Sequence, residues 1–279
     1  MSQDHTPIID FHIHIAPHEQ DTPDYENLLA DVFGSMEAVR EFKRHYADPA
    51  NMVAKLRDYG VDYGVALAEY SPLVTGCCTN EMVEDYCRGH RELLPFCSFN
   101  PFEEPDMPAA LRRLHGRGFK GIKLYPSYNH YHINDARMYP LYSLAQELGL
   151  PILVHTGTSI FKNTRLKYAH PIDVDDVAVD FPDLTLLMAH AGRMAWYSEA
   201  MTLARLHRNV YIELSGLAVK KLLQLFPDME RFSHKFVFGT DWPQVDTAKN
   251  IAAIRGLGLS EAAQARILGG NAARILGLA

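Results

Sequence analysis

The sequence predicts an α/β fold, a single-domain (β/α)8 TIM barrel, on three observations. The chain has 279 residues, and one complete barrel needs about 250. Short apolar runs alternate along it with stretches of helical periodicity. No glycine-rich phosphate loop follows the first expected strand, which disfavours an open dinucleotide-binding sheet. We therefore expect one barrel domain over residues 1–279.

The expected strands are short runs rich in β-branched and other apolar residues. Several of them are nearly continuous apolar runs, as in parallel strands that are buried on both faces. The alternation of strand and helix implies right-handed crossovers and a parallel sheet. The eight expected strands cover residues 8–13, 61–68, 94–99, 121–125, 151–155, 185–189, 210–214 and 235–239.

Helical periodicity fills the stretches between the strands. It is clearest at residues 138–148, 195–207 and 217–226. The segment of about 21–49 is longer than a simple connection, so we expect an inserted helical segment over the mouth of the barrel. Residues of about 260–279 predict amphipathic helices that close the barrel.

The composition limits the classes of partner. The 27 basic and 34 acidic residues give a net charge of −7, and no long basic run indicates a nucleic-acid or anionic-membrane surface. No apolar run approaches the ~18 residues of a membrane helix, and the N-terminus lacks the hydrophobic core of a signal peptide. The four cysteines form no paired zinc motif, and reduced thiols in a cytoplasmic protein are the simplest interpretation. We expect a small-molecule substrate and, as the common default, a homodimer.

Candidate functional residues gather at the carboxyl ends of the expected strands. In barrels of this kind the active site is built there, from the strand ends and the βα loops. His12 and His14 stand two residues apart in the first strand, so both side chains point to the same face. Later strand ends carry Lys123, His155, His190 and Asp241. Several strand ends that each offer a ligand-type residue are a stronger signal than an isolated His-X-His pair.

Neutral imidazole and carboxylate groups are ligands that suit zinc, manganese or iron(II). We expect one divalent cation, zinc in the first place, with manganese and iron as alternatives. Three histidines and one aspartate leave room for a water or substrate atom, whose reactivity the cation would raise.

Six segments of the chain carry a resemblance to a known family. They are IIDFHIHIAP, GIKLYP, PILVHTG, LMAHAGR, VYIELSG and FGTDWP, in this order at the expected strands. They resemble the amidohydrolase superfamily, and within it the amidohydrolase-2 branch, which includes the aminocarboxymuconate-semialdehyde decarboxylase-like enzymes. The resemblance runs from about Ile8 to the C-terminus. It implies that His12, His14, His155 and Asp241 are metal ligands and that His190 transfers a proton.

Lys123 has two interpretations. In binuclear amidohydrolases a lysine on the fourth strand is carboxylated and bridges two metals, and His155 and His190 would then bind the second metal. The resemblance to the amidohydrolase-2 branch favours one metal instead, with Lys123 as a structural or substrate-orienting cation. A free lysine is a good partner for an oxyanion or a carboxylate, so we prefer the single metal.

Other residues are candidates for the substrate pocket. Arg193 is expected to clamp a substrate carboxylate in bidentate fashion, with a salt bridge on the rim as the alternative. Tyr125 and Trp242 lie in expected βα loops and are candidates for an aromatic lining. Glu213 is either an acid that orients a ligand histidine from behind or a member of a buried structural pair.

Two reactions fit these residues. A metal-dependent hydrolase would attack an ester, lactone or amide of a small cyclic or carboxylated substrate with metal-activated water, and Asp241 or His190 would take the proton. A metal-dependent non-oxidative decarboxylase of an unsaturated or aromatic acid is the alternative, with His190 or water protonating carbon. Hydrolysis comes first because it is the commoner chemistry of the superfamily. A barrel that only binds a small ligand is the second alternative, although no expected ligand position is lost.

Overall fold

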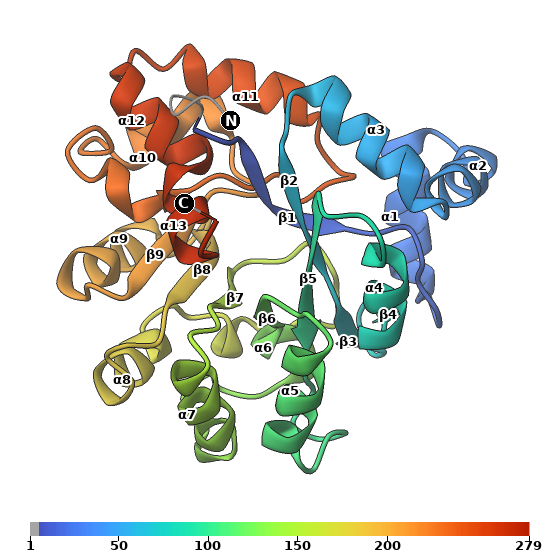
Figure 1. Ribbon diagram of the computed structural model, residues 1–279, viewed down its shortest axis with the longest axis horizontal. Helices are drawn as coiled ribbons and strands as arrows, with labels where there is room; N and C mark the ends of the chain where they lie inside the picture. Colours follow the sequence, from blue (N-terminus) through green and yellow to red (C-terminus); the bar gives the residue numbers. More distant parts are fainter. Residues whose placement is uncertain (1–5, 279) are drawn as a thin grey trace.

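The computed structural model describes residues 6–278 as eight parallel strands surrounded by helices (Figure 1). Each strand pairs with the next barrel strand along the chain. Backbone hydrogen bonds from Phe11 to Phe238 (3.0 Å) and from His14 to Trp242 (2.9 Å) join the last strand region to the first. The sheet therefore closes on itself, and the predicted single-domain barrel is confirmed. Residues 1–5, in the polar N-terminal segment noted from the sequence, and residue 279 lie outside the described part of the chain.

The eight predicted strands are all present, with bounds shifted by at most four residues. In barrel order they are β1 (Ile9–His14), β2 (Tyr63–Leu67), β5 (Leu93–Ser98), β6 (Gly121–Leu124), β7 (Ile152–Gly157), β8 (Leu186–Arg193), β9 (Val210–Glu213) and β10 (Phe236–Val237). An antiparallel hairpin of β3 (Glu69–Ser71) and β4 (Gly76–Cys78) follows β2, and the sequence did not predict it. These strands of three residues each are too short for a periodic signal.

The helices cover the outside of the barrel (Figure 1). The α-helices are α1 (Pro23–Phe33), α2 (Met36–Tyr46), α3 (Pro49–Tyr59), α4 (Asn80–Cys87), α5 (Met107–Gly116), α6 (Pro126–Asn129), α7 (Tyr139–Glu147), α8 (Asp173–Asp180), α9 (Tyr197–Leu206), α10 (Leu222–Leu225), α11 (Thr247–Arg255), α12 (Glu261–Ala265) and α13 (Asn271–Ile275). Short 3₁₀ turns lie at Ala136–Met138, Leu166–Tyr168, Val219–Lys221 and Ser233–Lys235, and a π-helical turn at Arg266–Gly270. No helix among residues 6–278 combines the length and the apolar character needed to cross a bilayer.

The expected insertion after β1 consists of α1 and α2. Thr22 caps α1 by accepting a hydrogen bond from the backbone N–H of Tyr25, and Ser35 caps α2 in the same way through Ala38. Tyr25 and Leu29 of α1 line the cavity at the carboxyl end of the barrel. The expected closing helices are also present, as α12, a π-helical turn and α13.

Two hydrophobic clusters hold the fold together. The larger one lies between the outer face of the strands and the helices, for example around Leu111, Leu141 and Phe236. The smaller one fills the barrel interior with residues from seven of the barrel strands, among them Phe11 and Phe96, whose rings meet edge to face with centroids 5.4 Å apart. This interior core supports the polar layer above it.

Candidate metal centre

A cavity opens at the carboxyl ends of the barrel strands, with about 660 Å³ of empty volume including its mouth. Most of the predicted site residues meet there, although they are far apart in the sequence. The inserted helix α1 and the β3–β4 hairpin add further walls. The residues that line the cavity include His12, His14, Tyr25, Glu69, Thr75, Lys123, Tyr125, Tyr128, His155, Ser159, Phe161, His190, Arg193 and Asp241.

His12, His14 and Asp241 form the closest set of ligand-type groups. Nε2 of His14 lies 3.1 Å from Oδ1 of Asp241, and Nε2 of His12 lies 3.4 Å from the same oxygen. The ligand-type atoms of the three residues all lie within 4.8 Å of one another. Two imidazole nitrogens and a carboxylate oxygen that converge in this way can share one divalent cation.

His155 and Lys123 each bring a buried polar atom without a partner into the same cavity. Nε2 of His155 and Nζ of Lys123 have no hydrogen-bond partner among the described residues. The ring of His155 lies 4.8 Å from that of His190, centroid to centroid, so it belongs to the same group. A buried nitrogen without a partner costs free energy unless a ligand satisfies it. The ligand-type atoms of these residues therefore fit a divalent cation, to which Nε2 of His155 could add a further ligand atom.

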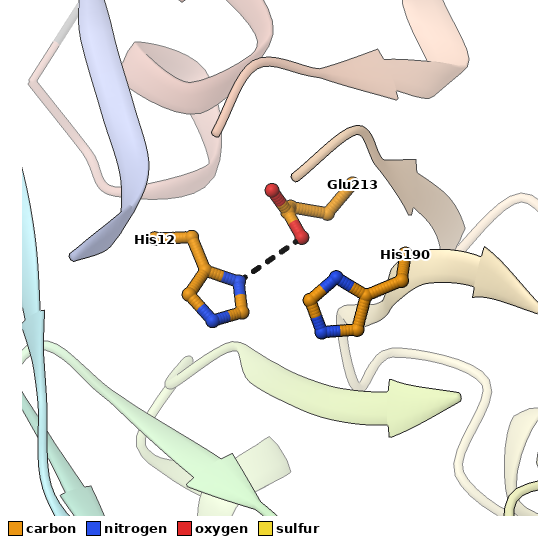
Figure 2. Close-up of side chains that lie close together, drawn as sticks. All are labelled: His12, His190 and Glu213. Carbon is orange, nitrogen blue, oxygen red and sulfur yellow. Dashed lines mark hydrogen bonds and ion pairs between the residues drawn. The ribbon is translucent and has the colours of Figure 1, made fainter. Parts of the chain in front are cut away.

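Ser215 links the inner nitrogens of two histidines. Its hydroxyl lies 2.9 Å from Nδ1 of His12 and 3.0 Å from Nδ1 of His190, and it donates to Oε2 of Glu213 (2.7 Å). Oε2 of Glu213 is also 3.2 Å from Nδ1 of His12, as Figure 2 shows. His12, His190 and Glu213 form a second close set of ligand-type atoms. The expected position of Glu213 behind a ligand histidine agrees with these contacts.

The protonation of His190 follows from its neighbours. Nδ1 of His190 lies 2.9 Å from the backbone carbonyl oxygen of Ser215, which can only accept a hydrogen bond. This contact places the proton of a neutral ring on Nδ1 and leaves a lone pair on Nε2. The ring also lines the cavity, so Nε2 is the nitrogen available to a substrate or to water.

Burial governs the charges at this site. It lowers the pKa of His12, His155 and His190 well below the ordinary value, and the nearby Lys123 or Arg193 lowers it further. Burial also opposes ionisation of Asp241, but His12 and His14 hold its pKa well below its usual range. Neutral imidazoles beside an ionised carboxylate are the protonation states that a cation requires.

The backbone turns sharply where two of the candidate residues lie. His190 has a φ of 63° and Asp241 a φ of 66°, both in the left-handed region that side chains other than glycine rarely adopt. Gly239 sits between the two neighbouring strands, and a Cβ there would lie 2.0 Å from Oε1 of Glu213. Such strain at a cavity wall is a common feature of functional sites.

Arg193 and Tyr125 reach the cavity, but Arg193 does so with less freedom than expected. Its Nε and Nη2 groups both donate to the carbonyl oxygen of Thr158, at 3.1 and 2.8 Å. The Nε–Nη2 edge of the guanidinium is therefore occupied, and the two N–H groups of Nη1 with the second N–H of Nη2 are left for a substrate. The hydroxyl of Tyr125 is buried and has no hydrogen-bond partner that the structure describes, and the centroid of its ring lies 4.9 Å from Nζ of Lys123.

Trp242 is the predicted pocket residue that the structure does not bring to the cavity. Its ring packs against those of Phe42 and Tyr46 in α2, with centroids 5.2 and 5.0 Å away. It is only 4% exposed and belongs to the outer core. The inserted helices are the reason, because α2 offers an apolar surface just beyond β10.

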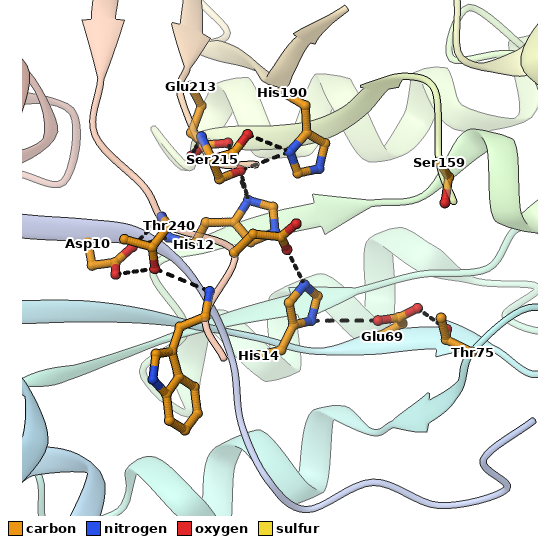
Figure 3. Close-up of polar contacts among 12 residues, drawn as sticks. Asp10, His12, His14, Glu69, Thr75, Ser159, His190, Glu213, Ser215 and Thr240 are labelled. Carbon is orange, nitrogen blue, oxygen red and sulfur yellow. Dashed lines mark hydrogen bonds and ion pairs between the residues drawn. The ribbon is translucent and has the colours of Figure 1, made fainter. Parts of the chain in front are cut away.

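The sequence prediction missed Ser215, Glu69 and Thr75. Ser215 stands one residue beyond the seventh predicted strand, and its position two residues after Glu213 was the available signal. Glu69 and Thr75 belong to the unpredicted hairpin, so no strand end pointed to them. The polar network that joins these residues to the histidines is drawn in Figure 3.

Comparison with known proteins identifies one matching family. The family described as amidohydrolase matches residues 9–278 of this chain. No curated protein sequence matches this chain.

Solved structures are similar over nearly the whole chain. An uncharacterised TIM-barrel protein from Bordetella bronchiseptica is 22% identical, with a TM-score of 0.78 over 97% of this chain and 98% of its own. A dihydroxybenzoic acid decarboxylase from Polaromonas, solved with bound manganese, is 15% identical, with a TM-score of 0.73 over 98% and 97%. A probable 2-pyrone-4,6-dicarboxylic acid hydrolase from Acinetobacter baumannii is 17% identical, with a TM-score of 0.69 over 97% and 99%. At these identities the likeness establishes the barrel fold.

Proposed function

The chain belongs to the amidohydrolase family, and we propose that it is a metal-dependent hydrolase of an ester, lactone or amide bond in a small carboxylated substrate. The observation that carries this proposal is the convergence of His12, His14 and Asp241 within 4.8 Å, in a cavity where Nε2 of His155 has no hydrogen-bond partner in the described part of the chain. These four residues would hold one divalent cation, for which zinc is the first candidate. When bound, the cation would polarise a carbonyl group and lower the pKa of water.

His190 is the proposed proton carrier. Because Nδ1 donates to the carbonyl oxygen of Ser215, the lone pair on Nε2 is free to take the proton of the attacking water. The same nitrogen then returns the proton to the leaving oxygen or nitrogen. The left-handed backbone at His190 and the hydroxyl of Ser215 fix the ring in this orientation.

Lys123 is the proposed partner of an anionic group on the substrate. Its ammonium group is fully buried and has no hydrogen-bond partner among residues 6–278, which is costly for a cation in the metal-free protein. Nη1 of Arg193 and the free hydroxyl of Tyr125 add further donors to the cavity. A substrate carboxylate, or the oxyanion formed during hydrolysis, would satisfy these donors.

Decarboxylation is the second candidate. The cationic Lys123 and the aromatic walls of Tyr125, Tyr128 and Phe161 also suit an aromatic acid. The similar structures include a decarboxylase that carries manganese as well as a probable hydrolase. Hydrolysis is placed first because the lone pair on Nε2 of His190 can take the proton of water directly, whereas protonation of a substrate carbon would need a protonated His190 or a water molecule as the donor.

A two-arm assay tests the proposal. Metal-loaded protein is incubated with a panel of carboxylated lactones, followed by loss of ring absorbance, and with a panel of hydroxylated benzoic acids, followed by release of carbon dioxide. Protein stripped with a chelator is the control for each. Lactone opening that depends on metal supports the proposal, and carbon dioxide release alone assigns the second candidate. Turnover in neither arm by metal-loaded protein would contradict both.

A further inference from the structure

Glu69 is a buried acid that stands directly behind His14. Oε2 of Glu69 lies 3.7 Å from Nδ1 of His14, while Nε2 on the other side of the ring faces Oδ1 of Asp241 at 3.1 Å. Glu69 is 4% exposed and comes from β3, the first strand of the hairpin that follows β2. Figure 3 shows the row from Thr75 through Glu69 to His14. The imidazole therefore lies between two carboxylates.

The arrangement at His14 repeats the one at His12. Nδ1 of His12 is backed by Oε2 of Glu213 at 3.2 Å, and Nε2 faces Oδ1 of Asp241 at 3.4 Å. The two glutamates come from opposite parts of the chain, one from the hairpin and one from the end of β9. Each histidine thus turns the same nitrogen toward Asp241 and the same nitrogen toward a buried glutamate.

We propose that Glu69 is a positioning residue for the metal site, which fixes the ring orientation and the tautomer of His14. This inference rests on the proposed function, since it concerns the cation that His14 would help to bind. At 3.7 Å the contact is an ion-pair distance rather than a hydrogen bond, and the negative charge of Glu69 favours a ring proton on Nδ1. The lone pair is then on Nε2, which faces Asp241 and is the nitrogen that a cation needs. The hydrogen bond between Nε2 and Oδ1 of Asp241 is the contact that a shared cation would replace.

The hairpin holds Glu69 in place. The hydroxyl of Thr75 donates to Oε1 of Glu69, which leaves Oε2 for His14. Thr75 is itself buried, and its carbonyl oxygen accepts a hydrogen bond from the backbone N–H of Thr22, 3.1 Å away. Because Thr22 also caps α1, the hairpin, the inserted helix and His14 form one connected wall.

The decisive variant is Glu69→Gln. Glutamine has nearly the same shape and its carbonyl oxygen still accepts from Thr75, so a merely structural role survives the change. Its amide NH₂ is a donor, however, and would turn toward Nδ1 of His14 and move the ring proton to Nε2. We expect the dissociation constant for Zn²⁺ or Mn²⁺ to rise about 10- to 100-fold, as for other residues that orient metal ligands. Metal-free protein is titrated by calorimetry, and its melting temperature is measured without metal.

Two further variants bracket this result. Glu69→Asp keeps the acceptor and should give an affinity between those of the wild type and Glu69→Gln. Glu103→Gln changes an exposed acid and should leave the affinity unchanged. The inference is overturned if Glu69→Gln binds the cation as tightly as the wild type, or if Glu69→Asp binds no better than Glu69→Gln. If Glu69→Gln does not fold, Glu69→Asp against the wild type decides, and equal affinities overturn the inference. A wild type that binds neither cation overturns the proposed function and this inference with it.

Discussion

The two ends of the barrel interior are built from the same strands, but one end is apolar and the other is polar. The lower part is filled by apolar side chains such as Phe11, Phe96 and Leu187, all fully buried. The upper part holds four histidines, a lysine and several acids, and some of their polar atoms have no hydrogen-bond partner among the described residues. In β7, Leu153 belongs to the lower part and His155, two residues on, to the upper one.

The residues that stabilise the fold and the residues of the candidate site therefore lie at opposite ends of the barrel interior. Apolar side chains in close contact stabilise the lower part, and every change of volume there is costly. The upper part carries buried polar groups that lower the stability of the metal-free protein, because some of their atoms have no hydrogen-bond partner among the described residues. Changes at the upper end should therefore alter metal binding and turnover, and changes at the lower end should alter stability.

The largest effect on function is expected at His190. Replacing it with alanine removes the nitrogen that takes the proton, so kcat should fall about 100- to 10,000-fold. The cation should still bind, since His190 is not among its four proposed ligands. Steady-state kinetics and metal content check both statements, with His132→Ala, an exposed histidine, as the control. Loss of the metal together with activity would instead make His190 a ligand.

A large effect on stability, rather than on function, is expected at Phe96. Its ring fills the lower interior so tightly that a Cβ on Gly121 would lie 2.3 Å from its Cζ. Phe96→Ala should lower the free energy of unfolding by about 3–5 kcal/mol, through lost burial and a residual void. Denaturant unfolding measures this loss. The metal affinity of the folded variant should stay near that of the wild type, and a large drop would refute the separation of the two ends.

A smaller effect on function is expected at Lys123, and here the substitution should not reduce stability. Lys123→Met removes a buried cation that has no hydrogen-bond partner among the described residues, so the stability of the metal-free protein should not fall and can rise. The KM for a carboxylated substrate should increase about 10- to 100-fold, because a charged hydrogen bond is lost. Thermal melting and kinetics test the two parts. A destabilised protein with unchanged KM would assign Lys123 a structural role.

The smallest effect is expected at Trp242, which lies beside the upper end but faces α2. Trp242→Phe should cost about 1–2 kcal/mol of stability by loosening the packing against Phe42 and Tyr46. The KM for substrate should remain unchanged. Unfolding curves and kinetics on the same preparation measure both, and a raised KM would return Trp242 to the substrate pocket.

The sequence predicted most of the barrel and the core of the site, because both depend on local patterns. Apolar runs mark buried parallel strands, and the last residue of such a run lies at the mouth of a barrel. His12, His155 and Asp241 could therefore be brought together without coordinates. The hairpin could not be predicted, since three-residue strands carry no period, and Glu69 and Thr75 were missed with it.

Side-chain direction was the other limit of the sequence. Trp242 follows Asp241 directly, yet the two side chains go to different places because α2 packs over one of them. The engagement of Arg193 with Thr158 depends on a loop whose path is set by tertiary contacts. Ser215 is an ordinary serine in the sequence, and only its distances to His12 and His190 mark it as part of the site.

We propose that one divalent cation binds at the upper end of the barrel. Elemental analysis of purified protein, on the wild type and on the Asp241→Asn variant, tests it most directly. We expect close to one equivalent of zinc or manganese per chain in the wild type, and its loss in the variant. About two equivalents would contradict the single-metal site and point to a carboxylated Lys123 as a bridge. No bound metal under any loading condition would contradict the metal centre itself.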